Sequence, residues 1–169
     1  MKNLVLIDGS SYLFRSFYAL PDLRNRNNEP TSAIHGVLNM INKFRKEYSF
    51  EHFACIFDPK GGSFRNEIYK EYKANRSAMP EDLRVQIKPL FDCISAMGIP
   101  LLVKNNYEAD DLIATLATKA IKKGINVIIS TGDKDMAQLA CEKITLIDTM
   151  KDHILDENAV FKKARIMVM

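Results

Sequence analysis

Five short apolar runs constrain the fold of this 169-residue chain more than any other feature of its sequence. They lie at residues 3–8, 53–57, 100–103, 126–130 and 144–148. Continuous apolar runs of this length are typical of strands that are buried on both faces. Longer segments with helical periodicity separate most of them, and such alternation predicts an α/β fold with a mainly parallel central sheet. The length suits one domain with a substantial core.

The segments between the predicted strands carry helix signals. Gly98 and Gly124 stand where two of these helices should end, because glycine readily closes a helix. A further helix is expected directly after the first strand, with Ser10 or Ser11 as its cap. The other expected helices span residues 32–48, 80–97 and 107–123.

Acidic residues follow four of the five predicted strands. In an open α/β sheet, ligands bind outside the carboxyl ends of parallel strands, so we expect these carboxylates to share one crevice. Carboxylates gathered in one place repel one another, and a divalent cation relieves that repulsion. Ligands that are all oxygen favour Mg²⁺ or Mn²⁺ over zinc. The predicted metal ligands are Asp8, Asp58, Glu108, Asp110, Asp111, Asp133 and Asp135.

Each acidic position by itself also has a purely structural interpretation. Asp8 and Asp58 precede a glycine and a proline, a setting typical of turns. The acids of residues 108–111 suit the positive end of a helix dipole, and those of residues 133–135 could be ordinary caps. Their joint occurrence at four strand ends is what indicates a site. Asp148, at the end of the fifth predicted strand, is left outside the predicted ligand set.

The spacing within residues 108–111 leaves two arrangements open. Glu108 and Asp111 are three residues apart and share one face of a regular helix, whereas Asp110 points elsewhere. Asp110 can join them only if Glu108 precedes the first helical turn, or if a second metal ion lies to one side. Two ions about 4 Å apart would explain why so many ligands are present.

Composition narrows the class of protein. Apolar residues make up 47% and charged residues 27%, as in soluble globular proteins. The net charge of +3 is mild, but without the seven predicted ligands the remaining surface is distinctly basic, as a phosphate binder needs. An odd count of three cysteines without a Cys-x-x-Cys pair favours a reducing cytoplasmic setting. Only four consecutive apolar residues precede Asp8, too few for a signal peptide or a membrane span.

Six motifs resemble one family in order and in spacing. The chain is similar to the 5′-nuclease domain at the amino end of bacterial DNA polymerase I, which is related to flap endonucleases and PIN-like nucleases. The resemblance runs from about residue 3 to about residue 163. The motifs lie at residues 6–15, 56–58, 72–76, 79–84, 108–111 and 130–139.

The resemblance implies a three-layer α/β/α sandwich and a metal-dependent 5′-3′ exonuclease or flap endonuclease of DNA replication and repair. Its partner would be DNA with a 5′ flap, a nick or an RNA primer. The predicted ligands would hold two ions, Mg²⁺ or Mn²⁺, with Asp110 among the catalytic residues. Lys73 and Arg76 match basic residues that grip a phosphate and are assigned to catalysis and DNA binding. Tyr72 matches a position that stacks on an unpaired base, and Arg15 matches a further DNA contact.

The end of the chain departs from the family. The family domain covers residues 1–163, whereas residues 164–169 do not resemble it. The helix-hairpin-helix region, which brings two further metal-site aspartates, and the polymerase domain are absent. We therefore expect reduced or undetectable nuclease activity. A separate chain is one candidate source of the missing helical half. A helix expected at about residues 156–163 would expose apolar surface and favour association.

Three other hypotheses stay open. A non-catalytic remnant of the same domain would bind DNA in a salt-sensitive way without needing Asp58 or Asp110. A PIN-type ribonuclease would cleave single-stranded RNA with no requirement for a 5′ end. A dinucleotide-dependent enzyme is disfavoured, because no Gly-x-Gly-x-x-Gly follows the first strand.

Overall fold

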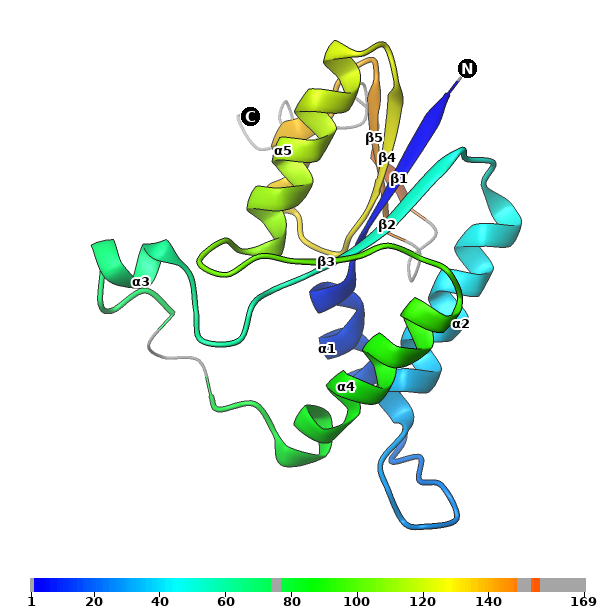
Figure 1. Cartoon of the computed structure of the whole chain (residues 1–169), viewed down its shortest axis with the longest axis vertical. Coiled ribbons are helices and arrows are strands. Elements are labelled where there is room, and N and C mark those ends of the chain that lie inside the picture. The colour runs from blue at the N-terminus through cyan, green and yellow to red at the C-terminus, as the bar shows by residue number, and fades with distance from the viewer. Residues whose placement is uncertain (1, 74–76, 149–152, 156–169) are drawn as a thin grey trace, which may run out of the picture.

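A single six-stranded sheet forms the centre of the molecule, in the order β3-β2-β1-β4-β5-β6 (Figure 1). The computed structural model describes residues 2–73, 77–148 and 153–155. Strands β1 to β5 are parallel and confirm the five predicted runs, whereas β6 is antiparallel to β5 and was not predicted. The strands are β1 Asn3–Asp8, β2 His52–Phe57, β3 Leu101–Val103, β4 Asn126–Ser130, β5 Ile144–Asp148 and β6 His153–Leu155.

Helices cover both faces of this sheet and confirm the three-layer α/β/α sandwich (Figure 1). Helices α1, α2 and α4 pack on one face, and α5 packs on the other. The helices are α1 Gly9–Ala19, α2 Ser32–Glu47, α3 Phe64–Ile68, α4 Glu81–Ala96, α5 Ala109–Lys122 and the 3₁₀ helix η1 Asp135–Leu139. Within the described residues, no helix is both long enough and apolar enough to cross a membrane.

Successive side chains of β1 point to opposite faces of the sheet, and both faces are covered, which explains why the central strands are apolar throughout. Val5 and Ile7 pack against α1, α2 and α4, whereas Leu6 packs on the α5 side. All three side chains are fully buried. Burying a side chain of this size contributes about 1.5–3 kcal/mol, so both layers are stabilised by the same strand. The three cysteines are free thiols.

The start of α1 corrects one expectation. Asp8, rather than Ser10 or Ser11, caps this helix, and its Oδ1 accepts a hydrogen bond from the backbone N–H of Ser11 at 2.9 Å. The next residue, Gly9, has to be a glycine, because a Cβ at this position would lie 2.3 Å from the ring of Phe57 at the end of β2. A glycine therefore lets the ends of β1 and β2 approach each other closely.

Strand order places the predicted crevice. The chain leaves β1 toward β2 and β3 on one side, and later occupies β4 and β5 on the other. Such a reversal of direction opens a crevice at the carboxyl ends of the two central strands. Asp8 pairs with Ile56 of β2 and Ile7 pairs with Ser130 of β4, so the three strands end almost level. The helix expected at about residues 156–163 lies outside the described residues.

Candidate functional site

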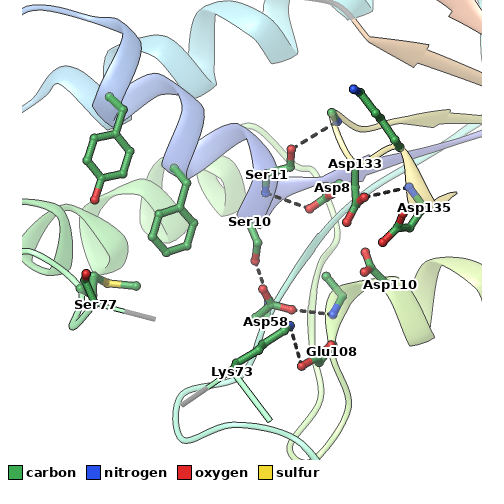
Figure 2. Close-up of a pocket in the computed structure, with 16 residues that line it drawn as sticks. Asp8, Ser10, Ser11, Asp58, Lys73, Ser77, Glu108, Asp110, Asp133 and Asp135 are labelled. Atoms are coloured by element: carbon green, nitrogen blue, oxygen red, sulfur yellow. Dashed lines mark hydrogen bonds and ion pairs between the residues drawn. The ribbon is translucent and has the colours of Figure 1, made fainter. Parts of the chain in front are cut away.

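An open cleft of about 790 Å³ lies at the carboxyl ends of the central strands, and six of the seven predicted carboxylates line it (Figure 2). They come from the end of β1, the loop after β2, the start of α5 and the loop after β4. A volume of this size is typical of ligand sites. The six carboxylates are Asp8, Asp58, Glu108, Asp110, Asp133 and Asp135.

Asp8 is the buried member of this group, with only 4% of its surface exposed. Its Oδ2 accepts a hydrogen bond from the Thr131 hydroxyl at 2.6 Å, and its Oδ1 accepts one from the Ser11 N–H. Burial raises the pKa of Asp8 above its ordinary value, although both hydrogen bonds oppose the shift. The carboxylate therefore joins the ends of β1 and β4 within the core.

Two hydroxyls at the start of α1 hold the neighbouring loops. Ser10 Oγ accepts a hydrogen bond from the Asp58 N–H at 2.8 Å, and Ser11 Oγ accepts one from the Gly132 N–H at 3.2 Å. Asp58 Oδ1 in turn accepts a bond from the Ala109 N–H at 2.7 Å, which ties the start of α5 to the loop after β2. Our sequence analysis missed these positioning roles, because each bond joins segments far apart in the chain.

The geometry at the start of α5 matches the first of the two arrangements left open above. Glu108 is the N-cap residue with extended backbone angles (φ −74°, ψ 161°), so it precedes the first helical turn. Asp110 consequently faces the cleft alongside Glu108 (Figure 2). Burial, followed by the negative charges of Asp8 and Asp133, raises the pKa of Asp110 to about 6.

Glu108 is held by three donors from the segment between β2 and α4. The Ser63 hydroxyl donates at 3.1 Å, the Tyr72 hydroxyl at 3.1 Å and the Lys73 ammonium at 2.8 Å. Burial by itself raises the pKa of Glu108, but these donors, Lys73 foremost, hold it below its ordinary value. Lys73 has a positive φ of 58°, which is uncommon for a residue with a side chain. Two of the predicted DNA contacts, Tyr72 and Lys73, thus lie at the predicted metal site.

Asp111 is the predicted ligand that does not line the cleft. Its two oxygens accept hydrogen bonds from the two terminal nitrogens of Arg65, at 2.7 Å each. Asp111 Oδ2 also accepts a bond from the Glu108 N–H at 3.0 Å, which completes a capping box at the start of α5. The Arg65 guanidinium, and then this backbone bond, hold the pKa of Asp111 below its ordinary value, although burial opposes them. Our sequence analysis missed Arg65, which lies in a stretch without clear periodicity.

Asp133 and Asp135 lie on the turn that leads from β4 into η1. Asp133 Oδ1 accepts a hydrogen bond from the Asp135 N–H at 2.9 Å, and the Asp133 N–H donates to the Thr131 hydroxyl at 3.0 Å. The turn therefore presents both carboxylates to the cleft (Figure 2).

Arg15 lies beside the site, in contact with Asp148 and Gly132. Its guanidinium donates to both oxygens of Asp148, at 2.8 and 3.1 Å, and thereby joins α1 to the end of β5. The same group lies against Gly132, where a Cβ would come within 2.1 Å of it. Asp148, left out of the predicted ligand set, is thus a partner of Arg15. The predicted DNA contact of Arg15 stays a prediction, and Arg76 lies outside the described residues.

The cleft carries the donor chemistry of a site for hard divalent cations, because its carboxylates supply only oxygen. Within the part of the chain that the structure describes, no group of three or more His, Cys, Asp or Glu side chains is already arranged to hold a metal ion. Protein donors engage several of the carboxylates instead, including Asp8, Asp58 and Glu108. The residues therefore fit a divalent cation by chemistry, and binding would require these side chains to exchange partners.

Comparisons with known proteins point to one family. The sequence model described as "5'-3' exonuclease, N-terminal resolvase-like domain" matches residues 3–165, so the chain belongs to this family. The chain is 52% identical over 160 residues to a DNA polymerase I of Pseudomonas aeruginosa, across 95% of this chain and 18% of that protein. It is 44% identical over 165 residues to a 5′-3′ exonuclease of Buchnera aphidicola, across 98% of this chain and 55% of that protein.

Solved structures share the fold. A T5 5′-exonuclease with bound divalent metal ions (zinc) superposes with a TM-score of 0.70 at 22% identity, covering 95% of this chain and 60% of that one. The catalytic core of Rad2 in complex with DNA substrate has a TM-score of 0.53 at 20% identity, covering 96% and 49%. The chain thus spans only part of each relative, about half of the Buchnera exonuclease and less than a fifth of the Pseudomonas polymerase.

Proposed function

We propose that this member of the 5′-3′ exonuclease family hydrolyses phosphodiester bonds near the 5′ end of a DNA strand with the help of divalent ions. One observation carries the proposal. Six carboxylates from four separate segments line a single cleft at the point where the strand order reverses. A carboxylate cleft in this family fits the binding of ions and phosphate better than any other chemistry that the fold offers.

The ion-binding residues that we propose are the six that line the cleft. Asp111 is not included, because Arg65 engages both of its oxygens. When bound, two Mg²⁺ or Mn²⁺ ions would supply a hydroxide nucleophile at neutral pH and offset the charge of the reacting phosphoryl group. The relative that binds metal ions, a T5 5′-exonuclease, supports divalent cations in general.

We assign Lys73 to the binding of the phosphate. Its ammonium lies at the cleft, 2.8 Å from Glu108, and an ammonium acts on a phosphate as a point charge. Once a cation engages Glu108, Lys73 can exchange that carboxylate for a phosphate oxygen. Arg76, three residues further on, is proposed to assist with a guanidinium fork.

Aromatic and apolar side chains beside the carboxylates suit the bases of a nucleic acid. Phe14, Tyr18 and Met79 line the same cleft and are 37%, 69% and 38% exposed. Exposed rings next to a phosphate-binding group are typical of sites for unpaired strands, because bases stack on them. We propose that Tyr72 also stacks on an unpaired base. The Rad2 relative, which is bound to DNA substrate, supports DNA as the partner.

Cleavage of a 5′-labelled flap and of a nicked duplex in Mg²⁺ and in Mn²⁺ tests the proposal. We expect the unmutated chain to cleave near the junction and the Asp110→Asn variant to show no cleavage. Cleavage that survives in Asp110→Asn would contradict the proposed site. Cleavage of single-stranded RNA without a 5′-end requirement would instead support the PIN-type ribonuclease.

A second candidate function is DNA binding without catalysis. Protein donors already engage several of the cleft carboxylates, including Asp8, Asp58 and Glu108, which favours this candidate. This hypothesis predicts salt-sensitive binding of flap DNA, unchanged in Asp110→Asn, with no cleavage in either metal.

A further inference from the structure

The two neighbouring aspartates of α5 have different surroundings. Asp110 lines the cleft, whereas Asp111 does not. Arg65 donates to both Asp111 oxygens at 2.7 Å, and its Nη1 also lies 3.6 Å from Glu108 Oε2. A guanidinium fork on a carboxylate fixes the planes of both groups. The pair therefore sets where α3 lies relative to the start of α5.

Few apolar contacts can hold α3 in this place. The helix has five residues, none of them buried, and Ile68 and Tyr69 are 78% and 57% exposed. The ring of Phe64 contacts Tyr107 at a centroid distance of 5.8 Å. Hydrophobic burial normally dominates the position of a helix, so a helix with so little of it depends on its polar contacts.

The same segment delivers the groups that bond to Glu108 of the cleft. Ser63, Tyr72 and Lys73 all bond to Glu108, and Asn66 donates to the Tyr72 carbonyl at 3.0 Å. These contacts depend on the segment lying against α5. Arg65 makes a bidentate contact between this segment and α5, through two hydrogen bonds of 2.7 Å each.

We propose that Arg65 and Asp111 form a clasp that positions residues 63–73 at the cleft, and that Asp111 acts through this clasp rather than as a metal ligand. Arg65 is thus a positioning residue. The inference rests on the proposed function for the role of the metal ions, whereas the clasp itself can be tested without them. It divides the Glu-Ala-Asp-Asp motif into two cleft residues, Glu108 and Asp110, and one structural residue, Asp111.

Two charge-matched variants test the first half of this inference. Asp110→Asn and Asp111→Asn each remove one negative charge at adjacent positions. Titration of the chain with Mn²⁺ should show an affinity at least about 10-fold lower for Asp110→Asn, the scale of a lost metal-site partner. Asp111→Asn should change it by less than about 3-fold, the scale of an exposed charge pair. Equal losses in the two variants would overturn the assignment of Asp111.

Hydrogen exchange of the backbone amides of residues 63–72 tests the second half. Arg65→Ala and Asp111→Asn should each speed exchange in this segment, and the double variant should show no more than either one, because the two residues act as a unit. Arg65→Lys keeps the charge but not the fork, so it should restore protection only in part. Arg84→Ala, which removes an exposed pair with Glu81 on α4, is the control and should leave the segment unchanged.

The outcomes separate the inference from the proposed function. Unchanged exchange in Arg65→Ala would overturn the clasp, whatever the metal titration shows. If the unmutated chain binds no Mn²⁺ while exchange responds as expected, the clasp stands, but both the proposed metal chemistry and the contrast between Asp110 and Asp111 are wrong.

Discussion

The two walls of the cleft are built in different ways. The inner wall, formed by Asp8, Ser10, Ser11 and Thr131, stands on strands whose central residues are fully buried. The outer wall is the segment of residues 63–73, which lines the cleft through Lys73 and includes a helix with no buried residue. Hydroxyl and backbone bonds hold the inner wall, whereas ion pairs, together with the hydroxyls of Ser63 and Tyr72, hold the outer one.

The two walls therefore differ in how easily their contacts rearrange. The hydrogen bonds to Asp8 lie inside the core, where an unmatched polar group is costly, so this carboxylate gives them up only in exchange for another partner. In the outer wall, the Lys73–Glu108 pair is partly exposed, with 32% of the Lys73 side chain accessible, and such a pair rearranges at little cost, whereas the Arg65–Asp111 clasp holds the segment in place. We infer that the inner wall holds Asp8, one of the proposed metal ligands, in place, and that Lys73 of the outer wall exchanges its partner when the proposed DNA substrate binds.

Of the two walls, the outer one should give the larger effect. Lys73→Met should lower single-turnover cleavage of a flap substrate by about 10–100-fold, because a hydrogen bond to a charged group is worth about 1.5–3 kcal/mol. The thermal midpoint should stay nearly unchanged, since the outer wall contributes little to the core.

Lys134→Met is the matched control for Lys73→Met. Lys134 also lines the cleft, but it belongs to the turn after β4 and not to the outer wall. An equal loss of cleavage in the two variants would show that total charge, rather than the position of Lys73, governs the reaction.

The inner wall should respond through stability. Thr131→Val keeps the shape of the side chain but removes the donor to Asp8 and the acceptor for the Asp133 N–H. Leaving such buried groups unsatisfied costs about 1–3 kcal/mol, and each kcal/mol lowers the thermal midpoint of a chain of this size by about 2–4 °C. Thermal unfolding followed by circular dichroism measures this.

Thr118→Val controls for the change of side chain in Thr131→Val. Thr118 is exposed on α5 and donates to the Ala114 carbonyl at 2.8 Å. Its replacement should stay within about 0.5 kcal/mol. A similar loss in both variants would mean that the inner wall has no special role in stability.

A smaller effect should appear at Asp110, which lies between the walls. Its pKa of about 6 in the folded protein exceeds the ordinary value of 3.8, so the folded state binds the extra proton between these two values. The stability that protonated Asp110 contributes to the folded state is fully present below about pH 4 and is lost as the pH rises through about 6.

Asp110→Asn removes that dependence. At pH 7 and without metal, it should therefore raise the free energy of unfolding by about 1 kcal/mol, after allowance for solvent screening. The gain over the unmutated chain should vanish near pH 4. A difference that does not change between pH 4 and pH 7 would contradict the raised pKa of this carboxyl group.

Local patterns were enough for the layers of the fold but not for its small elements. The apolar runs and the glycines after α4 and α5 located five strands and the main helices, because burial on both faces leaves a clear signal in sequence. Helix α3 has five residues and strand β6 has three, so each is too short for periodicity to reveal it. The cap of α1 was assigned to serine, because the dual use of Asp8 depends on Thr131, far along the chain.

The sequence by itself determined that carboxylates follow the strands and would meet at one edge of the sheet, since parallel strands end together. It could not determine which of them face the cleft. Only the tertiary structure separated Asp110 from Asp111, because that choice depends on Glu108 preceding the first turn of α5 and on Arg65 reaching across from α3. A residue's side of a helix follows from where the helix begins, and here contacts between distant segments set that point.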